Sequence, residues 1–310
     1  MRRIGSVSGH GTVWHGSAGP QLRAAAARTS AAPRRIADPG LVGRACPVVP
    51  VGRALPPPGY RPAPGRVDAW VLRMSPAQTA AAERLSGLLD SNELQRVERC
   101  GAAAGREVLL TSHVVLRLLL GAQLGLPPDE VVVLRAACPG CGEPHGRPVV
   151  SAAPALHFSL SHSNGLAVCA FAATAVGVDV EALASIPGTE LVPLLHPAEQ
   201  EAIRRLPSRR QVPAFLSCWV RKEAYLKGTG EGLSAELGSV HVGWGADGGP
   251  RTVGQPGTGA WGLAHVATPP GYAGAVALLT PERAAAGLPE PAVDVYDVDL
   301  PTWAAHRIGY

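Results

Sequence analysis

The amino-acid sequence predicts an α+β protein. Helical periodicity and apolar strand-like segments are mixed along the chain without strict alternation, which argues against a doubly wound parallel sheet. Apolar residues make up 46% of the 310 residues, enough for a sizeable core, and 17% are charged. No uninterrupted apolar run reaches the roughly 18–20 residues that span a bilayer, so we expect a soluble protein without a membrane partner.

The predicted elements follow from hydrophobic periodicity and from glycine and proline stops. Gly125 and Pro127 end one helix, Pro197 opens another, and Gly228 ends a third. The expected helices cover residues 85–94, 106–124, 198–206 and 214–227, and the expected strands cover residues 67–74, 131–135, 166–172, 175–180, 239–244, 261–266 and 273–279.

The first 66 residues differ in composition from the rest of the chain. They contain ten arginines, no lysine and one acidic residue, Asp38, and they are rich in Ala, Gly and Pro. We expect this segment to be disordered or loosely attached. An over-extended start site or an organelle transit peptide would show the same bias. The other 244 residues carry 18 basic and 23 acidic groups, a net charge of −5, so the basic pI does not indicate nucleic-acid binding.

Six scattered cysteines would make a poor disulfide framework for a chain of this length, which favours a reducing, cytoplasmic compartment. The stretch Cys138-Pro-Gly-Cys141, followed by His145, is similar to a zinc-binding turn. A closed zinc site needs four ligands, and a second such pair is missing from the sequence. We therefore interpret this stretch as a tight Gly/Pro-containing loop, with a metal as the alternative.

Two carboxylates follow each other at strand spacing in Gly-Val-Asp-Val-Glu, residues 177–181. Because side chains two residues apart share a face of a strand, Asp179 and Glu181 project to one side and Val178 and Val180 to the other. Like charges this close repel unless a cation or protons lie between them. A solvated strand face is the alternative interpretation.

A third carboxylate, Glu223, lies one helical turn before Lys227 in the stretch WVRKEAYLKGTGEG. Only two of the 28 basic residues are lysines, Lys222 and Lys227, and a lysine places a compact charge where the arginine fork does not fit. Three hard oxygen ligands suit Mg²⁺, and a neighbouring ammonium could offset the charge of a pyrophosphate. An ordinary surface pair at i, i+4 spacing is the alternative.

The stretch Phe-Ser-Leu-Ser-His-Ser, residues 158–163, offers hydroxyl and imidazole groups that could bind phosphate, or it could form a polar turn. A Ser-His-Asp hydrolase does not fit, because Ser161 and His162 are adjacent and the sequence lacks a G-x-S-x-G motif.

Together these stretches resemble the 4′-phosphopantetheinyl transferases of the larger, two-subdomain type. The resemblance rests on SLSHS, GVDVE and WVRKEAYLKGTGEGL in the family's order, and on Gly146-Arg147-Pro148 before them. It covers about residues 67–280. His113 departs from the family pattern, since many relatives have arginine there, and the cysteine loop is an insertion relative to the shortest members.

The resemblance implies transfer of 4′-phosphopantetheine from coenzyme A to a serine of an acyl, peptidyl or polyketide carrier domain, of the holo-[acyl-carrier-protein] synthase type, with release of adenosine 3′,5′-bisphosphate. It implies two similar α+β subdomains, at residues 67–180 and 181–310, related by a pseudo-twofold with coenzyme A in the cleft between them. It also implies a monomer.

Carried over by position, the resemblance makes Asp179, Glu181 and Glu223 the ligands of Mg²⁺ or Mn²⁺. Glu223 would also be the base toward the carrier serine, and Lys227 would contact the pyrophosphate. The nucleotide and its 3′-phosphate would be bound by Arg147, Ser161 and His162.

Two other functions use the same residues. A Mg²⁺-dependent hydrolase of nucleotides or pyrophosphates would need the same carboxylates, and a non-catalytic module could bind coenzyme A alone. The intact carboxylates and Lys227 speak against the second. The sequence leaves open which carrier is modified, whether acyl-coenzyme A is accepted, and what Lys222 does.

Overall fold

The computed structural model describes residues 54–151, 153, 155–186, 188–232, 237–244, 252–253, 259–280 and 290–306. Of the segment predicted to be disordered or loosely attached, residues 1–66, the first 53 residues lie outside the described residues. The helices are α2 (Pro76–Arg84), α3 (Ser91–Arg99), α4 (Ala103–Leu124), α5 (Pro197–Arg204), α6 (Ser208–Thr229) and α7 (Leu300–His306). The strands are β1 (Arg66–Arg73), β2 (Val133–Arg135), β3 (Pro148–Val150), β4 (His157–Ser163), β5 (Leu166–Ala172), β6 (Val176–Ala182), β7 (Thr252–Val253), β8 (Ala260–His265), β9 (Tyr272–Thr280) and β10 (Ala292–Asp297).

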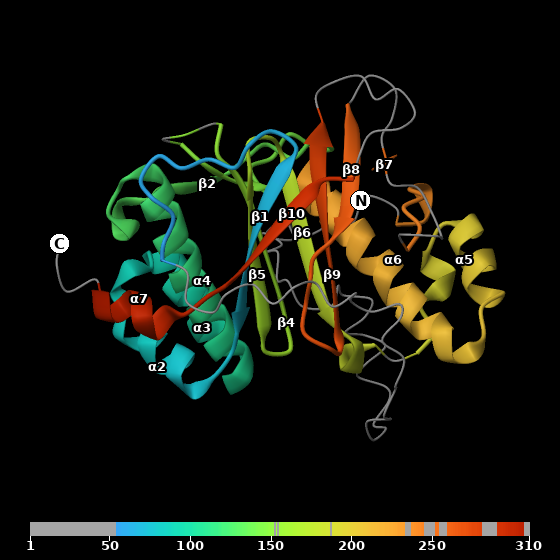
Figure 1. Ribbon diagram of the computed structural model, residues 1–310, viewed down its shortest axis with the longest axis horizontal. Helices are drawn as coiled ribbons and strands as arrows, with labels where there is room; N and C mark the ends of the chain where they lie inside the picture. The colour runs from blue at the N-terminus through green and yellow to red at the C-terminus, as the bar shows by residue number, and fades with distance from the viewer. Residues whose placement is uncertain are drawn as a thin grey trace, which may run out of the picture.

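Two four-stranded sheets form the centre of the molecule, and helices cover them on both sides (Figure 1). The first sheet has the order β10-β1-β5-β4 and the second the order β6-β9-β8-β7, while β2 and β3 form a separate pair. Small apolar side chains fill the space between the sheets, among them Val67, Val168, Val178, Val180 and Val276. The fold is therefore α+β, as the sequence predicts.

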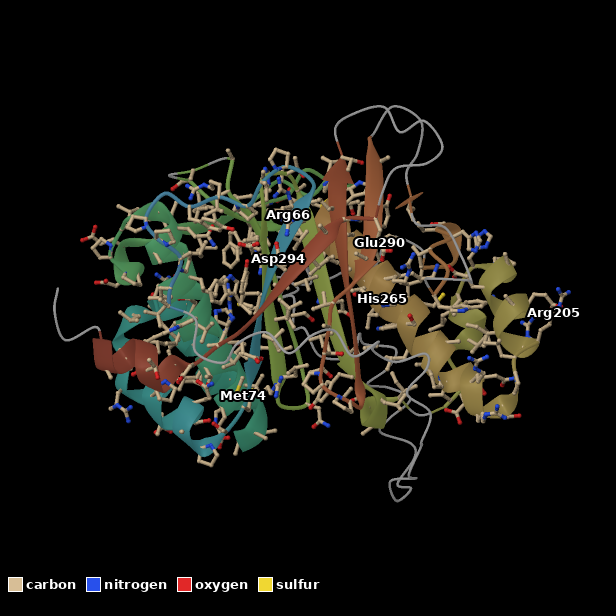
Figure 2. The ribbon with its side chains drawn as sticks, viewed as in Figure 1. Arg66, Met74, Arg205, His265, Glu290 and Asp294 are labelled. Carbon is tan, nitrogen blue, oxygen red and sulfur yellow. The ribbon has the colours of Figure 1, made fainter. Side chains whose placement is uncertain are left out.

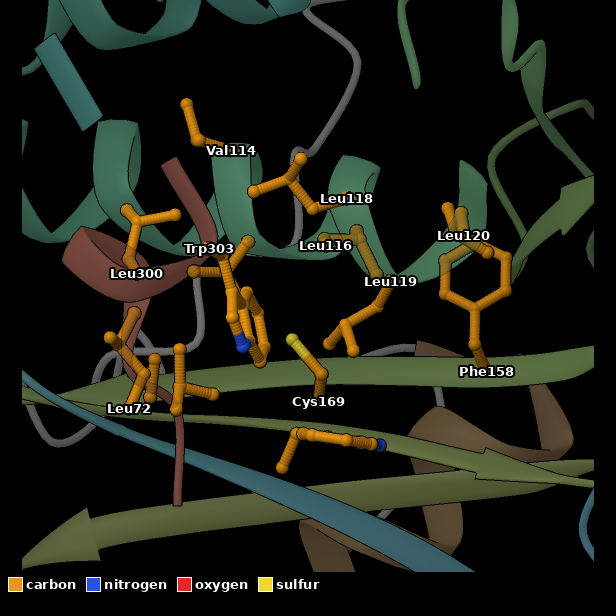
Figure 3. Close-up of a cluster of buried hydrophobic side chains, with 14 of the residues drawn as sticks. Leu72, Val114, Leu116, Leu118, Leu119, Leu120, Phe158, Cys169, Leu300 and Trp303 are labelled. Carbon is orange, nitrogen blue, oxygen red and sulfur yellow. The ribbon is translucent and has the colours of Figure 1, made fainter. Parts of the chain in front are cut away.

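The outer face of the first sheet packs against α4 and the C-terminal helix α7 (Figure 3). Leu119 and Leu120 of α4 meet Phe158 and Cys169 of the sheet, and Trp303 of α7 closes the same cluster. Helix α4 is long and apolar enough to span a membrane, but 67% of its most apolar 18-residue stretch is buried inside the protein. These contacts are those of a core helix.

The two sheets meet edge to edge through a ladder of serine side chains. Ser159, Ser161 and Ser163 of β4 accept hydrogen bonds from the backbone N–H groups of Val178, Val180 and Ala182 at 3.1–3.2 Å. Buried N–H groups at a sheet edge need such acceptors, because leaving them unpaired costs about 1–3 kcal/mol each. The period-2 serines therefore fix the register of β4 against β6.

Several local predictions differ from the structure. Residues 158–163 form strand β4 rather than a turn. The helix predicted at 85–94 is α3, which begins at Ser91 because Asp90 and Glu93 form a capping box there. Residues 239–244 contain no strand among those described, since Leu237–Ser239 is a short 3-10 helix and the following residues are irregular. Helix α6 begins at Ser208, ahead of Pro213, which lies inside it.

The subdomain boundary expected between residues 180 and 181 falls inside strand β6, which belongs to the second sheet. The C-terminal strand β10 returns to the first sheet and pairs in parallel with β1, where Arg66 and Asp294 form an ion pair of 2.5 Å (Figure 2). Residues 54–65 contact α4 rather than lying loose, because Gly59 N donates to Gln123 O at 3.0 Å.

Candidate active site

Helix α6 crosses β6 at very close range, and two glycines make this possible. A Cβ atom at Gly177 would lie 1.9 Å from Ala224 O and 2.4 Å from Gly228 N, and one at Gly228 would lie 2.4 Å from the ring of Trp261. Only glycine fits at these two positions. The close crossing brings the side chains of α6 that face the sheet onto the strand that carries Asp179 and Glu181.

Asp179 lies at the centre of a buried polar cluster formed by β4, β6 and α6. Lys227 Nζ donates to Asp179 Oδ1 at 2.6 Å and to Ser161 Oγ at 3.0 Å, and Ser161 Oγ donates to Asp179 Oδ1 at 2.8 Å. Asp179 is 2% exposed and Lys227 is 9% exposed. Burial raises the pKa of Asp179, while the charge of Lys227 opposes this shift.

The other two carboxylates lie beside this pair. Ser163 Oγ donates to Glu181 Oε2 at 2.6 Å. Burial, followed by the negative charge of Asp179, raises the pKa of Glu181 to about 8 and that of Glu223 to about 7. Two oxygens of the cluster, Asp179 Oδ2 and Glu223 Oε1, are buried without a hydrogen-bond partner. Such orphaned carboxylate oxygens are costly unless a proton or a cation joins them.

A cavity lies beside Lys227. Its wall is formed by residues of α3, α4, β2, β3 and β4. Helix α6 adds one residue to the wall, Lys227. Asp179, Glu181 and Glu223 do not line it, so Lys227 is the group that connects the cavity to the carboxylate cluster. A second cavity shares Arg96 and His162 with the first.

The cavity wall carries an excess of positive charge. Arg96, Arg135 and Arg147 line it, and within the described part of the chain none of them pairs with a carboxylate. Burial, and then the charge of Arg96, lowers the pKa of Arg135, and burial lowers that of Arg147. Arg147 Nη1 donates to His157 Nδ1 at 2.9 Å. Guanidinium groups without carboxylate partners can bind phosphate-type anions.

A buried ion network supports the opposite side of the same cavity. Arg117 Nε donates to Glu93 Oε2 at 2.6 Å and its Nη2 donates to Asp90 Oδ2 at 2.7 Å, while His113 Nδ1 lies 3.0 Å from Glu93 Oε1. Sequence reasoning missed this network and also missed Arg96 and Arg135. No local pattern groups these residues, because three of them are ordinary members of a set of 26 arginines and their partners lie on different elements, α3 with its N-cap, α4 and β2.

Most residues that the sequence singled out come together, with one difference. Asp179, Glu181, Glu223 and Lys227 form one cluster, and Arg147 and His162 line the adjoining cavity. Ser161 was expected to bind nucleotide, yet it is fully buried, does not line the cavity and bonds Asp179 and Lys227 instead.

Comparison with known proteins decides the family. The model of the 4'-phosphopantetheinyl transferase superfamily matches residues 175–277, which include β6 and α6. The 4'-phosphopantetheinyl transferase HetI of Nostoc sp. is 31% identical over 194 residues, covering 60% of this chain and 77% of the relative. The chain belongs to the 4'-phosphopantetheinyl transferase superfamily.

Further relatives agree with this assignment. The phosphopantetheinyl transferase psf-1 of Bacillus pumilus is 31% identical over 160 residues, covering 52% of this chain and 59% of the relative. Sfp of Bacillus subtilis is 26% identical over 160 residues, covering 52% of this chain and 68% of the relative. The resemblance seen in the sequence is confirmed, and the hydrolase alternative is not supported.

Proposed function

We propose that this phosphopantetheinyl transferase acts as a cytoplasmic monomer of the holo-[acyl-carrier-protein] synthase type and transfers phosphopantetheine from coenzyme A to a serine of carrier domains. The observation that carries the proposal is the junction at Lys227, which joins a cavity lined by unpaired arginines to a cluster of buried carboxylates. An anionic substrate in the cavity would place its pyrophosphate beside Lys227. The described cysteines are free thiols, in keeping with a reducing compartment.

The carboxylate cluster fits a hard divalent cation. Asp179 Oδ2 and Glu223 Oε1 are buried and unpaired, and carboxylate oxygens are the ligands that Mg²⁺ or Mn²⁺ prefers. Asp179, Glu181 and Glu223 would hold the ion, and they would have to close around it. The oxygens of these three carboxylates do not all lie within 4.8 Å of one another. Among the described residues, only Cys138, Cys141 and His145 form a trio of possible ligands that close. When bound, the metal would neutralise charge on the pyrophosphate.

The chain's own groups would position and activate the reactants. The arginines of the cavity wall and His162 would bind the nucleotide and its 3′-phosphate, and the two halves of the molecule would enclose coenzyme A between them. Lys227, oriented by Ser161 and Asp179, would stabilise the charge that develops on the departing bisphosphate. Glu223 Oε1, which lacks an internal partner, would accept the proton of the carrier serine.

Intact-protein mass spectrometry tests the proposal. An apo carrier domain incubated with coenzyme A, Mg²⁺ and the enzyme should gain one phosphopantetheine group, and Glu223→Gln should abolish this gain. In the absence of a carrier, adenosine 3′,5′-bisphosphate should not be released. Release without a carrier would instead indicate a hydrolase, and a carrier panel that remains unmodified throughout would contradict the proposed transfer.

A further inference from the structure

The loop that joins β2 to β3 gathers three potential soft-metal ligands. The ligand atoms of Cys138, Cys141 and His145 all lie within 4.8 Å of one another, and Cys141 Sγ is 2.9 Å from His145 Nε2. Cys138 is buried, whereas Cys141 and His145 are exposed. The carboxylate cluster described above uses none of these residues.

The backbone of the loop turns tightly between Cys138 and Glu143. The loop closes through Gly142 N to Cys138 O and Cys138 N to Glu143 O, both 2.8 Å, with Gly142 at a φ of +79°. This turn holds the sulfur of Cys138 close to the ligand atoms of Cys141 and His145.

We propose that Cys138, Cys141 and His145 bind one Zn²⁺ ion. Two thiolates and an imidazole are the soft and borderline ligands that select zinc over Mg²⁺. Because Cys141 and His145 are exposed, solvent would reach the trio and could supply the fourth ligand of a tetrahedral ion.

The site would position an arginine of the coenzyme A cavity. His145 is followed by Gly146, whose N–H bonds Ala136 O at 2.9 Å and where a Cβ would lie 2.7 Å from the same oxygen. The next residue, Arg147, lines the cavity, and its backbone N would lie 3.3 Å from a Cβ at Gly230. A metal at the base of the loop would therefore hold the Arg147 backbone against the end of α6.

The sequence alone favoured a tight turn here, because it offered three ligands and not four. The structure changes this interpretation, since it brings all three ligand atoms together and leaves Cys141 and His145 exposed to solvent. A tight turn alone would not require His145 Nε2 to meet Cys141 Sγ. A disulfide between Cys138 and Cys141 is the other chemistry available to the pair, although both thiols are free in the structure.

Elemental analysis of the full chain, purified without a metal-binding tag, tests the proposal. We expect about one zinc per chain, and after exchange with Co²⁺ we expect the visible absorption of tetrahedral thiolate coordination. Cys141→Ser should lose both signals. Cys100→Ser, which changes a half-exposed cysteine outside the loop, should keep them.

Metal content does not depend on transferase activity, so this test is separate from that of the proposed function. Should Cys141→Ser fail to fold, removal of zinc from the wild type by a chelator, followed by thermal unfolding, gives a second measurement. We expect a lower Tm that added Zn²⁺ restores. The proposal would be overturned if the purified protein contained no metal and mass spectrometry showed either two reactive thiols at Cys138 and Cys141 or a disulfide between them.

Discussion

Lys222 and Glu199 form a fully buried ion pair, in which Lys222 Nζ lies 2.8 Å from Glu199 Oε2 and the side chains are 1% and 0% exposed. The remaining hydrogen-bonding groups are also used. Lys222 donates to Leu237 O at 2.9 Å and to Val240 O, and Glu199 Oε1 accepts from Val242 N at 2.7 Å. The pair therefore joins α5, α6 and the segment 237–243. Lys222 is structural, in contrast to Lys227 on the same helix.

We predict that Lys222→Met destabilises the protein by about 3–5 kcal/mol, because it leaves the Glu199 carboxylate buried without its cation. Urea unfolding followed by circular dichroism would measure the loss. The double variant Lys222→Met/Glu199→Gln removes both charges and should recover part of the lost stability. A loss below about 1 kcal/mol in the single variant would mean that the pair contributes no more than an exposed one.

Lys227→Arg tests whether the proposed role of Lys227 depends on the shape of its side chain rather than on its charge. Because Lys227 Nζ fits between Asp179 Oδ1 at 2.6 Å and Ser161 Oγ at 3.0 Å, the wider guanidinium should crowd the position of the pyrophosphate. We expect a folded protein whose activity lies well below that of the wild type. Lys227→Ala should lower kcat by roughly a hundredfold or more.

The readout for Lys227 is steady-state transfer to a carrier domain, with thermal unfolding as the control for folding. Arg221 offers a comparison on the same helix, since it is also buried but donates to Val242 O at 3.1 Å, away from the cluster. Arg221→Lys should affect stability more than turnover. Full activity in Lys227→Arg would show that the choice of lysine over arginine has no catalytic meaning.

Sequence reasoning found the candidate active-site cluster because its parts are local patterns. The alternation in residues 177–181 places Asp179 and Glu181 on one face, and the helical spacing places Glu223 one turn from Lys227. It could not find what depends on distant partners. The serines of β4 are compatible with a polar turn in the sequence, and only the neighbouring strand β6 shows that they pair two sheet edges. The sequence likewise does not separate Lys222 from Lys227, because the partner of Lys222 is Glu199, 23 residues away.

The tertiary arrangement also explains the errors at the boundaries. Strand β10 pairs with β1 across more than 200 residues, and no local pattern in residues 292–297 shows which sheet they join. Similarly, Arg96, Arg135 and Arg147 come from α3, β2 and the loop before β3, so the positively charged cavity is a product of folding.

The raised carboxyl pKa values predict how pH and Mg²⁺ affect stability. Glu181 and Glu223, with pKa values of about 8 and about 7, hold protons in the folded state at pH values where the unfolded chain has lost them. The metal-free protein should therefore lose stability as pH rises from about 4.5 toward 8, since the folded state binds more protons in that window. Mg²⁺ requires the ionised carboxylates, so its stabilising effect should be larger at pH 8.5 than at pH 6.

Thermal unfolding with and without Mg²⁺ at these two pH values measures the effect. Glu223→Gln removes one titrating group and one ligand, and it should weaken both the pH dependence and the response to Mg²⁺. An equal Tm shift by Mg²⁺ at pH 6 and pH 8.5 would mean that protons and the ion do not compete at these carboxylates.

The last prediction concerns where the folded chain begins. The composition of residues 1–66 predicted a disordered or loosely attached segment, but residues 54–65 contact α4. Leu55 packs on the core beside α4, Gly59 N donates to Gln123 O at 3.0 Å, and Arg61 Nη1 donates to the same oxygen at 2.7 Å. A chain that begins at Ala54 should unfold at the same temperature as the full chain, because residues 1–53 are poor in the bulky apolar side chains that build a core.

A chain that begins at Val67 should be less stable by about 2 kcal/mol or more, since it loses the partial burial of Leu55 and the hydrogen bonds to Gln123 O. It also loses Arg66, which pairs with Asp294 of β10, but that pair is exposed and contributes little. Arg66→Ala in the longer chain controls for this loss and should change stability by less than about 1 kcal/mol. Equal melting of the chains that begin at Ala54 and Val67 would show that residues 54–65 rest on α4 without stabilising it.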